Sequence, residues 1–260
     1  MSERSMKNPF SLENKTVIIT GGSGGLGTPI SEGLLTMGAT VVVADLVEPA
    51  HNSDNIIYIY CDLSDTESIR AMFQAVKAQR GRIDVLINCA TYGAGYGPSG
   101  QLDRLSDADW AKGLDGSIGT TFRCTREVIP YMAEQGGGSI INFSSIHGLT
   151  AVDPYMFGDS GLNTPGNYST GKAGVIQFTR YSAINLANKG IRVNCVTPGT
   201  FPNQSELQKT DLIQKLSKQT ILGRVGRPEE IVGAVLLLAS NASSYMTGAN
   251  IVVDGGWTSW

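Results

Sequence analysis

Short apolar segments alternate with helix-like stretches along almost the whole chain of 260 residues. The apolar segments are rich in β-branched residues and are bounded by glycine or aspartate, as buried strands are. We predict strands at about 16–20, 39–45, 55–62, 83–90, 138–145, 191–199 and 249–256, and helices at about 25–37, 64–80, 107–134, 165–188 and 228–239. Strands that alternate with helices pair in parallel, and the helices cover both faces of the sheet. The predicted fold class is therefore α/β, with a doubly wound parallel sheet of about seven strands.

Nothing in the sequence marks a boundary between domains. There is no linker rich in proline, serine or charge and no internal repeat, so we predict one domain over 1–260 with a flexible N-terminal tail at about 1–10. Ser64 and Glu67 fit a capping box at the start of the second helix, and Pro228 suits the first turn of the last one.

The glycine-rich segment TGGSGGLG, residues 20–27, lies between the first predicted strand and the first predicted helix. Glycines in this position let the backbone approach a pyrophosphate, and the free N–H groups at the helix N-terminus attract an anion. The spacing of Gly21, Gly25 and Gly27 differs from G-x-G-x-x-G, with three residues and then one between glycines. We predict a Rossmann-type dinucleotide site that includes Gly21, Ser23, Gly24, Gly25, Leu26 and Gly27.

Asp45 ends the second predicted strand, where a carboxylate accepts hydrogen bonds from the adenosine ribose hydroxyls and repels a 2′-phosphate. No lysine or arginine lies in the glycine loop or next to Asp45, so NAD is favoured over NADP. Leu46 adjoins this position. At the end of the third strand, Asp62 and Leu63 are placed to meet the adenine, although Asp62 also fits a role as a cap for the next helix.

Composition excludes several classes of partner. The net charge is −3 and no long run of lysine or arginine appears, which argues against nucleic acid and anionic membrane as partners. The apolar stretches are too short to span a bilayer, and residues 1–10 lack an apolar signal core. The four cysteines are widely spaced without a metal-binding pattern, so we expect no metal, reduced thiols and a cytoplasmic location.

Further motifs follow in a fixed order, and together they resemble the short-chain dehydrogenase/reductase family in its single-domain branch. Besides the glycine loop and Asp45, the matching segments are CDLS, NCA (88–90), INFSS, YSTGK (168–172), RVNCVTPG and MTGANIVVDGG. The resemblance runs from about residue 10 to 256. Each motif is modest alone, but the set in this order is highly specific.

The resemblance implies a catalytic group built on Tyr168 and Lys172, which share one face of a helix because they lie four residues apart. A phenol beside an ammonium releases its proton more readily. Tyr168 would exchange a proton with the substrate oxygen, Ser145 would hydrogen-bond that oxygen, and Lys172 would also hold the nicotinamide ribose. The same resemblance places Asn88, Ala90, Pro198, Gly199, Thr200 and Phe201 around the cofactor.

Two single positions depart from the family pattern. Ser117 stands where the family has an asparagine that positions a water connecting the active-site lysine to solvent. The interpretations left open are a rearranged water chain and altered catalysis. Thr91 replaces a glycine of the usual NNAG, which would be strained if the position needs a positive φ; a shifted loop is the other interpretation.

Two longer segments are expected to shape the substrate site. The stretch 146–167 is longer than the family norm, and its polar residues predict a wall for a sugar, polyol or sugar acid; a plain surface loop is the alternative. The predicted substrate residues are His147, Asp153, Tyr155 and Asn163. The polar stretch 200–224 is expected to act as a mobile lid.

Three functions remain compatible with the sequence. The first is an NAD-dependent oxidoreductase that interconverts a secondary alcohol and a ketone, with a carbohydrate substrate. The second is a 3-oxoacyl carrier-protein reductase, against which Asp45 and the acidic balance argue. The third is a non-catalytic nucleotide-binding or scaffold protein, against which the retained Ser145, Tyr168 and Lys172 argue. The resemblance further implies a homotetramer or a homodimer.

Overall fold

The computed structural model describes residues 8–50, 54–94, 100–151 and 164–260. Its centre is a sheet of seven parallel strands in the order β3-β2-β1-β4-β5-β6-β7. The strands are β1 (Thr16–Thr20), β2 (Thr40–Asp45), β3 (Ile56–Tyr60), β4 (Val85–Asn88), β5 (Gly138–Phe143), β6 (Ile191–Pro198) and β7 (Asn250–Val253). The predicted fold class, a doubly wound parallel sheet, is confirmed.

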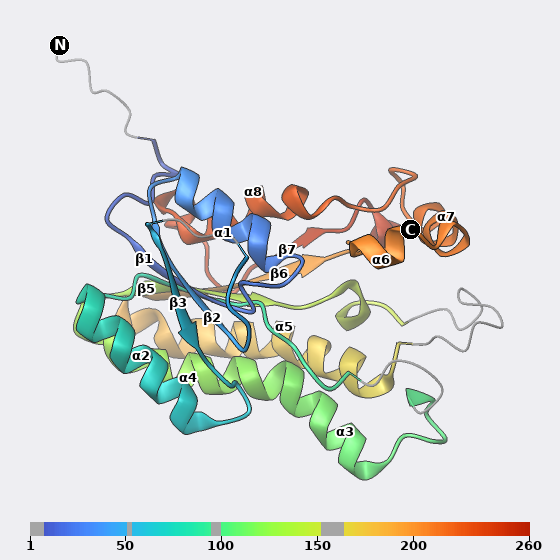
Figure 1. Ribbon diagram of the computed structural model, residues 1–260, viewed down its shortest axis with the longest axis horizontal. Helices are drawn as coiled ribbons and strands as arrows, with labels where there is room; N and C mark the ends of the chain where they lie inside the picture. The colour runs from blue at the N-terminus through green and yellow to red at the C-terminus, as the bar shows by residue number, and fades with distance from the viewer. Residues whose placement is uncertain (1–7, 51–53, 95–99, 152–163) are drawn as a thin grey trace.

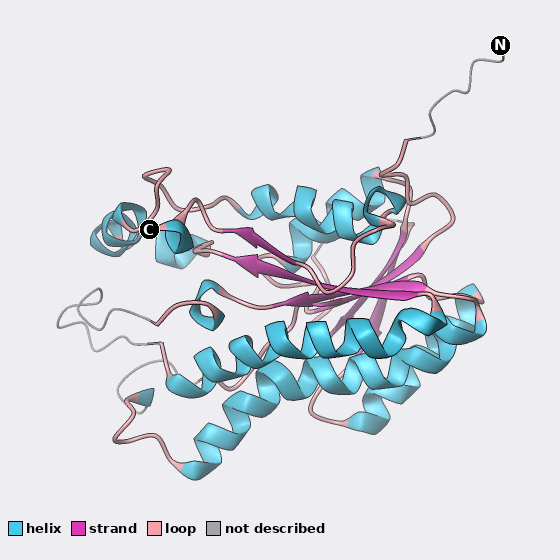
Figure 2. Cartoon of the chain, turned by 180° about the vertical axis from the view of Figure 1, so that it is seen from behind, coloured by secondary structure: helices cyan, strands magenta, loops and turns pink. Residues whose placement is uncertain are grey.

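Helices cover both faces of the sheet because successive strand residues point to opposite sides. On one face, Ile18 and the residues of neighbouring strands that point to the same side pack against α2 (Thr66–Arg80), α4 (Thr120–Glu134) and α5 (Gly166–Leu186). On the other face, Val17 and Ile19 pack against α1 (Gly27–Thr36) and α8 (Val232–Ala239). The two helical layers are visible on either side of the sheet in Figure 1 and, from behind, in Figure 2.

The strand order places a topological switch at the centre of the sheet. The chain runs outward from β1 through β2 to β3, then crosses to β4 on the other side of β1. β1 pairs in register with both neighbours, so that Thr20 is level with Ala44 and with Asn88. The loops that follow β1 and β4 therefore leave the sheet from adjacent positions, which opens a crevice at the carboxyl ends of the strands.

The start of α2 differs from the sequence prediction. Asp65 is the N-cap, and its side chain accepts a hydrogen bond from the N–H of Glu67. The Ser64 hydroxyl instead donates to Asp62 Oδ1 at 2.7 Å. An aspartate caps a helix as well as a serine does, so the pattern pointed to the right turn but to the wrong residue.

The single helix predicted over 107–134 is interrupted. It divides into α3 (Asp107–Leu114), a π-helical turn over Asp115–Gly119 and α4. π-turns within helices are frequently found at functional sites. This turn contains Ser117, the residue that stands in place of the family's asparagine.

The C-terminal third supplies the remaining elements. Residues 200–224, predicted as a lid, contain two short helices, α6 (Gln204–Leu207) and α7 (Thr210–Lys218). The Gly226 N–H donates to the Thr200 carbonyl oxygen at 3.0 Å, so the two ends of this segment lie side by side. The helix predicted at 228–239 begins as a 3₁₀ turn over Pro228–Ile231 and continues as α8.

Candidate active site

The glycine loop joins β1 to α1 in a conformation that side chains would obstruct. Gly21 has a φ of +69°, which a residue with a Cβ rarely adopts. A Cβ at Gly27 would lie 2.1 Å from the Gly21 carbonyl oxygen. Leu26 at the N-cap makes no side-chain hydrogen bond to the first turn of α1. This cradle fits a pyrophosphate, because the backbone can approach it and the helix terminus faces it.

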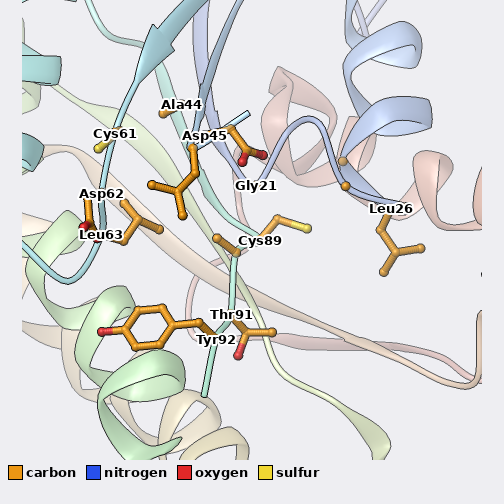
Figure 3. A pocket seen from close by; sticks show the side chains of 15 residues that line it. Gly21, Leu26, Ala44, Asp45, Cys61, Asp62, Leu63, Cys89, Thr91 and Tyr92 are labelled. Atoms are coloured by element: carbon orange, nitrogen blue, oxygen red, sulfur yellow. The ribbon is translucent and has the colours of Figure 1, made fainter. Parts of the chain in front are cut away.

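A cleft of about 390 Å³ extends from the glycine loop across the ends of β2, β3 and β4 (Figure 3). Most of the predicted adenosine-side residues line it. The cleft is lined by Gly21, Gly24, Gly25, Leu26, Gly27, Ala44, Asp45, Leu46, Cys61, Asp62, Leu63, Cys89, Ala90, Thr91 and Tyr92. The predicted Ser23 and Asn88 do not belong to this lining.

Asp45 is held in place by two backbone N–H groups. One carboxylate oxygen accepts a hydrogen bond from the Ser23 N–H at 3.1 Å, and the other accepts one from the Val47 N–H at 3.3 Å. The Ser23 hydroxyl donates to the Val47 carbonyl oxygen at 2.7 Å. Ser23 therefore orients the carboxylate that would receive a ribose.

Asn88 connects strands beneath the cleft. Its Nδ2 donates to Asn142 Oδ1 at 2.9 Å, and Asn142 Nδ2 donates to the Thr179 hydroxyl at 2.9 Å. These buried amides join β4, β5 and α5. Asn88 therefore ties the central strands together, and a direct contact with a cofactor stays a prediction.

Thr91 takes an ordinary backbone conformation. Among the described residues with a side chain, only Asn14 has a positive φ. Among the described residues of the loop after β4, Gly93 has a positive φ, at +68°. Thr91 is therefore not strained, and a shift of the loop relative to the family stays a prediction.

Tyr168 and Lys172 occupy the first turns of α5, and they face each other. Lys172 Nζ lies 5.7 Å from the centroid of the Tyr168 ring. The Lys172 side chain is only 4% exposed, and its Nζ donates to the Phe143 carbonyl oxygen at 2.9 Å. At the start of the helix, Asn167 Nδ2 donates to the Asp109 carbonyl oxygen at 2.8 Å, which docks the tyrosine-bearing turn onto α3.

A second cleft, of about 410 Å³, contains the predicted catalytic oxygen atoms. Ser145 follows β5 directly, and its hydroxyl accepts a hydrogen bond from the His147 N–H at 3.2 Å. The lining combines residues after β5, the start of α5, the end of β6 and the predicted lid: Ser145, Ile146, His147, Thr164, Tyr168, Gly199, Thr200, Phe201, Pro202, Glu206, Lys209, Leu212 and Leu216. Pro198 ends β6 just outside this cleft.

His147 is the one predicted substrate residue that the described part of the chain contains, and it lines the second cleft. Burial lowers the pKa of its imidazole to about 4, so the ring is neutral near pH 7. Its Nδ1 is buried and has no hydrogen-bond partner among the described residues. Asp153, Tyr155 and Asn163 lie outside the described residues.

Ser117 does not line either cleft. Its hydroxyl donates to the Gly113 carbonyl oxygen at 2.6 Å inside the helical segment. A Cβ at Gly171 would lie 2.0 Å from this hydroxyl oxygen. Ser117 therefore packs against α5 beside Lys172, and a direct catalytic role for it stays a prediction.

The comparison with protein-family models adds the deciding observation. The model described as enoyl-(acyl carrier protein) reductase matches residues 21–258. The chain belongs to the short-chain dehydrogenase/reductase family. It is accordingly an NAD(P)-dependent oxidoreductase that acts on CH–OH groups, and the non-catalytic alternative is set aside.

Individual members of the short-chain dehydrogenase/reductase family are similar to this protein over nearly the full chain. A 3-oxoacyl-(acyl-carrier-protein) reductase of Thermotoga maritima is 34% identical, over 94% of this chain and 98% of its own. A short-chain dehydrogenase of Leptospira borgpetersenii with bound NAD⁺ has a TM-score of 0.89 at 34% identity, covering 99% of this chain and 98% of its own. The ligand-free aldohexose dehydrogenase of Thermoplasma acidophilum has a TM-score of 0.83 at 26% identity, covering 96% of each chain.

Sequence reasoning missed part of both clefts. Tyr92 and Cys61 line the first cleft, and Glu206 and Lys209, from the predicted lid, line the second. Cys61 and Tyr92 lie directly after β3 and shortly after β4, so their position at the carboxyl edge was an available signal.

The described residues form no cluster of metal ligands, and none of their helices is long and apolar enough to cross a membrane.

Proposed function

We propose that this protein interconverts a secondary alcohol and a ketone of a sugar, polyol or sugar acid, with NAD as the cofactor. The observation that carries the proposal is the placement of Ser145 and Tyr168 on the wall of the second cleft, with Lys172 directly behind the tyrosine. When bound, the nicotinamide ring supplies or accepts a hydride. Tyr168 transfers the proton to or from the substrate oxygen, and Ser145 hydrogen-bonds that oxygen.

Lys172 supports this chemistry from a buried position. Its ammonium is held by the Phe143 carbonyl oxygen and lies beside the Tyr168 ring, so this hydrogen bond fixes the charged end of the lysine next to the tyrosine. Because the lysine is almost fully buried, water screens its interaction with the neighbouring ring poorly.

The choice of NAD over NADP rests on Asp45. Two backbone N–H groups fix its carboxylate at the adenosine end of the first cleft. A 2′-phosphate there would meet a negative charge, and among the described residues neither an arginine nor a lysine lines this cleft. The bound NAD⁺ of the Leptospira neighbour agrees with this choice.

The carbohydrate substrate rests on the polar groups of the second cleft. His147, Glu206 and Lys209 line it together with the Ser145 and Tyr168 hydroxyls. Several hydrogen-bonding groups around one reacting carbon suit a polyhydroxylated substrate, whose neighbouring hydroxyls each need a partner. The similarity to an aldohexose dehydrogenase supports this class of substrate.

A 3-oxoacyl carrier-protein reductase is the second candidate function. The observation in its favour is the 34% identity to the Thermotoga maritima reductase over nearly both chains. The apolar Leu212 and Leu216 of the lid line the second cleft and would suit an acyl chain.

Two measurements distinguish these candidates. Calorimetric titration with NADH and NADPH should show tighter binding of NADH, and a preference for NADPH would contradict the role assigned to Asp45. A panel of aldoses, polyols and sugar acids should produce NADH absorbance at 340 nm. Turnover confined to 3-oxoacyl thioesters would instead establish the second candidate.

An oligomer is part of the proposal. On the helical layer formed by α4 and α5, the aromatic and aliphatic side chains of Phe122, Tyr181 and Ile184 are exposed. An exposed apolar patch of this kind is typical of a subunit interface. Light scattering after size exclusion should give the mass of a homodimer or homotetramer, and Ile184→Glu should lower that mass.

A cytoplasmic location also belongs to the proposal. All four cysteines are free, and three of them are buried. Unpaired thiols are typical of proteins that work in a reducing compartment. Fractionation of the source cells, followed by immunoblotting, tests this location.

A further inference from the structure

Three polar side chains form a connected group behind the wall of the first cleft. Arg123, on α4, donates from Nη1 to Asp115 Oδ1 at 2.6 Å and from Nη2 to Asp115 Oδ2 at 3.0 Å. The Tyr92 hydroxyl donates to Asp115 Oδ2, and Arg123 Nη2 lies 3.3 Å from the Tyr92 hydroxyl. None of these contacts involves a residue of the glycine loop or a predicted catalytic residue.

The same arginine also holds a second part of this wall. Its Nε and Nη2 donate to the Leu63 carbonyl oxygen at 3.0 and 2.8 Å. Leu63 lies between β3 and α2, and Tyr92 lies in the loop after β4; both line the first cleft. In Figure 3 the Tyr92 ring lies beside Asp62 and Leu63, with Leu26 on the other side of the cleft.

Charge-assisted hydrogen bonds hold this group together. The Arg123 side chain is 14% exposed and that of Asp115 is 41% exposed, so water screens the paired hydrogen bonds between them in part. The Arg123 guanidinium lowers the pKa of Asp115, which stays ionised near pH 7. Burial and the neighbouring Asp115 raise the pKa of Tyr92 to about 12, so its hydroxyl keeps the proton that it donates.

We propose that Arg123, Asp115 and Tyr92 act as positioning residues that fix the wall opposite Leu26 in the adenosine half of the cofactor cleft. Arg123 holds the Leu63 carbonyl from behind, while Asp115 holds the Tyr92 ring. The two parts of the wall come from separate loops, and Arg123 joins them through direct hydrogen bonds. The inference rests on the proposed binding of a dinucleotide in this cleft.

The location of the group predicts which step it affects. Leu63 and Tyr92 line the first cleft and are absent from the lining of the second, where Ser145 and Tyr168 lie. Loosening the clamp formed by Arg123, Asp115 and Tyr92 should therefore weaken binding of the adenosine part of the cofactor. The turnover number at saturating cofactor and substrate should change little, because the reacting residues keep their positions.

Arg123→Lys and Tyr92→Phe test the proposal on the full-length protein. Lysine keeps the charge, but its single ammonium group cannot make the paired hydrogen bonds that the guanidinium makes to Asp115 and Leu63. Phenylalanine keeps the ring but removes the hydroxyl. By calorimetry, Arg123→Lys should raise the Kd for NAD by about tenfold, the equivalent of one charge-assisted hydrogen bond. ADP-ribose, which lacks the nicotinamide, should lose affinity by the same factor.

Arg70→Lys is the matched control, because Arg70 forms ion pairs with Glu67 and Glu127 at the surface and does not line either cleft. It should bind NAD as the wild type does. An unchanged Kd in both clamp variants would overturn the proposal, as would a lower turnover number with an unchanged Kd. If Arg123→Lys fails to fold, Tyr92→Phe alone decides between these outcomes.

Failure of the proposed function is recognisable separately. A wild-type protein that binds neither NAD nor NADP would overturn the dinucleotide site and this inference together. Normal binding by the wild type with normal binding by the variants would overturn the clamp alone.

Discussion

The Lys172 ammonium lies 5.7 Å from the centroid of the Tyr168 ring and donates a hydrogen bond to the Phe143 carbonyl oxygen. The lysine thereby connects the helix that carries the tyrosine to the end of the strand that precedes Ser145. The tyrosine, the serine and the positive charge are held by two packed elements, α5 and β5, rather than by loops alone. This arrangement underlies the first prediction.

Tyr168→Phe should reduce the turnover number by about 10²- to 10⁴-fold, the usual contribution of one proton-transferring group. The ring is retained, so the packing beside Lys172 should persist and the Kd for NAD should stay within a few-fold of the wild type. Steady-state kinetics and calorimetry on the same preparations check both parts. Substantial remaining turnover would remove Tyr168 from its assigned role.

Asp45→Asn should shift the cofactor preference from NAD toward NADP. The amide removes the negative charge, and it accepts only one of the two hydrogen bonds that Ser23 and Val47 donate to the carboxylate. The ratio of the Kd for NADP to the Kd for NAD should fall by about tenfold or more, since one favourable contact is lost and one repulsion is relieved.

Glu48→Gln is the matched control for this shift, since Glu48 is an exposed acid in the same loop and does not line the cleft. It should leave the ratio of the two Kd values unchanged. An equal change of this ratio in both variants would mean that cofactor preference depends on the overall negative charge of the loop and not on the position of the Asp45 carboxylate.

Gly171→Ala should destabilise the protein, although alanine is the better helix former. The new Cβ would lie 2.0 Å from the Ser117 hydroxyl oxygen, so either this hydroxyl turns away from the Gly113 carbonyl or α5 and the π-turn move apart. Overpacking of this kind costs about 1–3 kcal/mol, more than the roughly 1 kcal/mol gained from helix propensity. Urea unfolding followed by circular dichroism measures the difference.

Ser117→Ala should rescue Gly171→Ala, because it removes the oxygen that the new methyl group meets. In the double variant most of the lost free energy of unfolding should return, with a coupling of at least about 1 kcal/mol. Additive losses would show that the two positions do not contact each other in solution.

The stability of the protein should fall between pH 6.5 and pH 4 partly because of His147. Burial lowers its pKa in the folded protein to about 4, below the ordinary value of 6.5, so the unfolded chain binds a proton in this range and the folded chain does not. The free energy of unfolding therefore decreases as the pH falls, and this contribution levels off below about pH 4.

His147→Gln should reduce this loss of stability by about 3 kcal/mol over the same range, because glutamine does not titrate. Thermal unfolding at a series of pH values checks it. His51→Gln, at the other histidine of the chain, is the control. Identical pH dependence in the wild type and His147→Gln would contradict the assignment.

Much of the architecture was predictable because it depends on local patterns. The alternation of apolar strands with helices predicted the parallel sheet, and the glycines between a strand and a helix predicted the loop from β1 to α1, while the close approach of Gly27 to Gly21 was seen only in the structure. The choice of Asp65 over Ser64 as the helix cap was not predictable, since both residues are good caps and their competition depends on the exact exit of the chain from β3.

The residues of the site divide in the same way. By itself, the sequence determined the fold class, the glycine loop, the acid at the end of β2 and the spacing that puts Tyr168 and Lys172 on one helix face, because each of these depends on neighbours within a few positions. Only the tertiary structure placed Ser117 against Gly171 and joined Tyr92, Asp115 and Arg123 behind the cofactor cleft. Those contacts join segments that meet only when the helices pack on the sheet, and no local pattern records them.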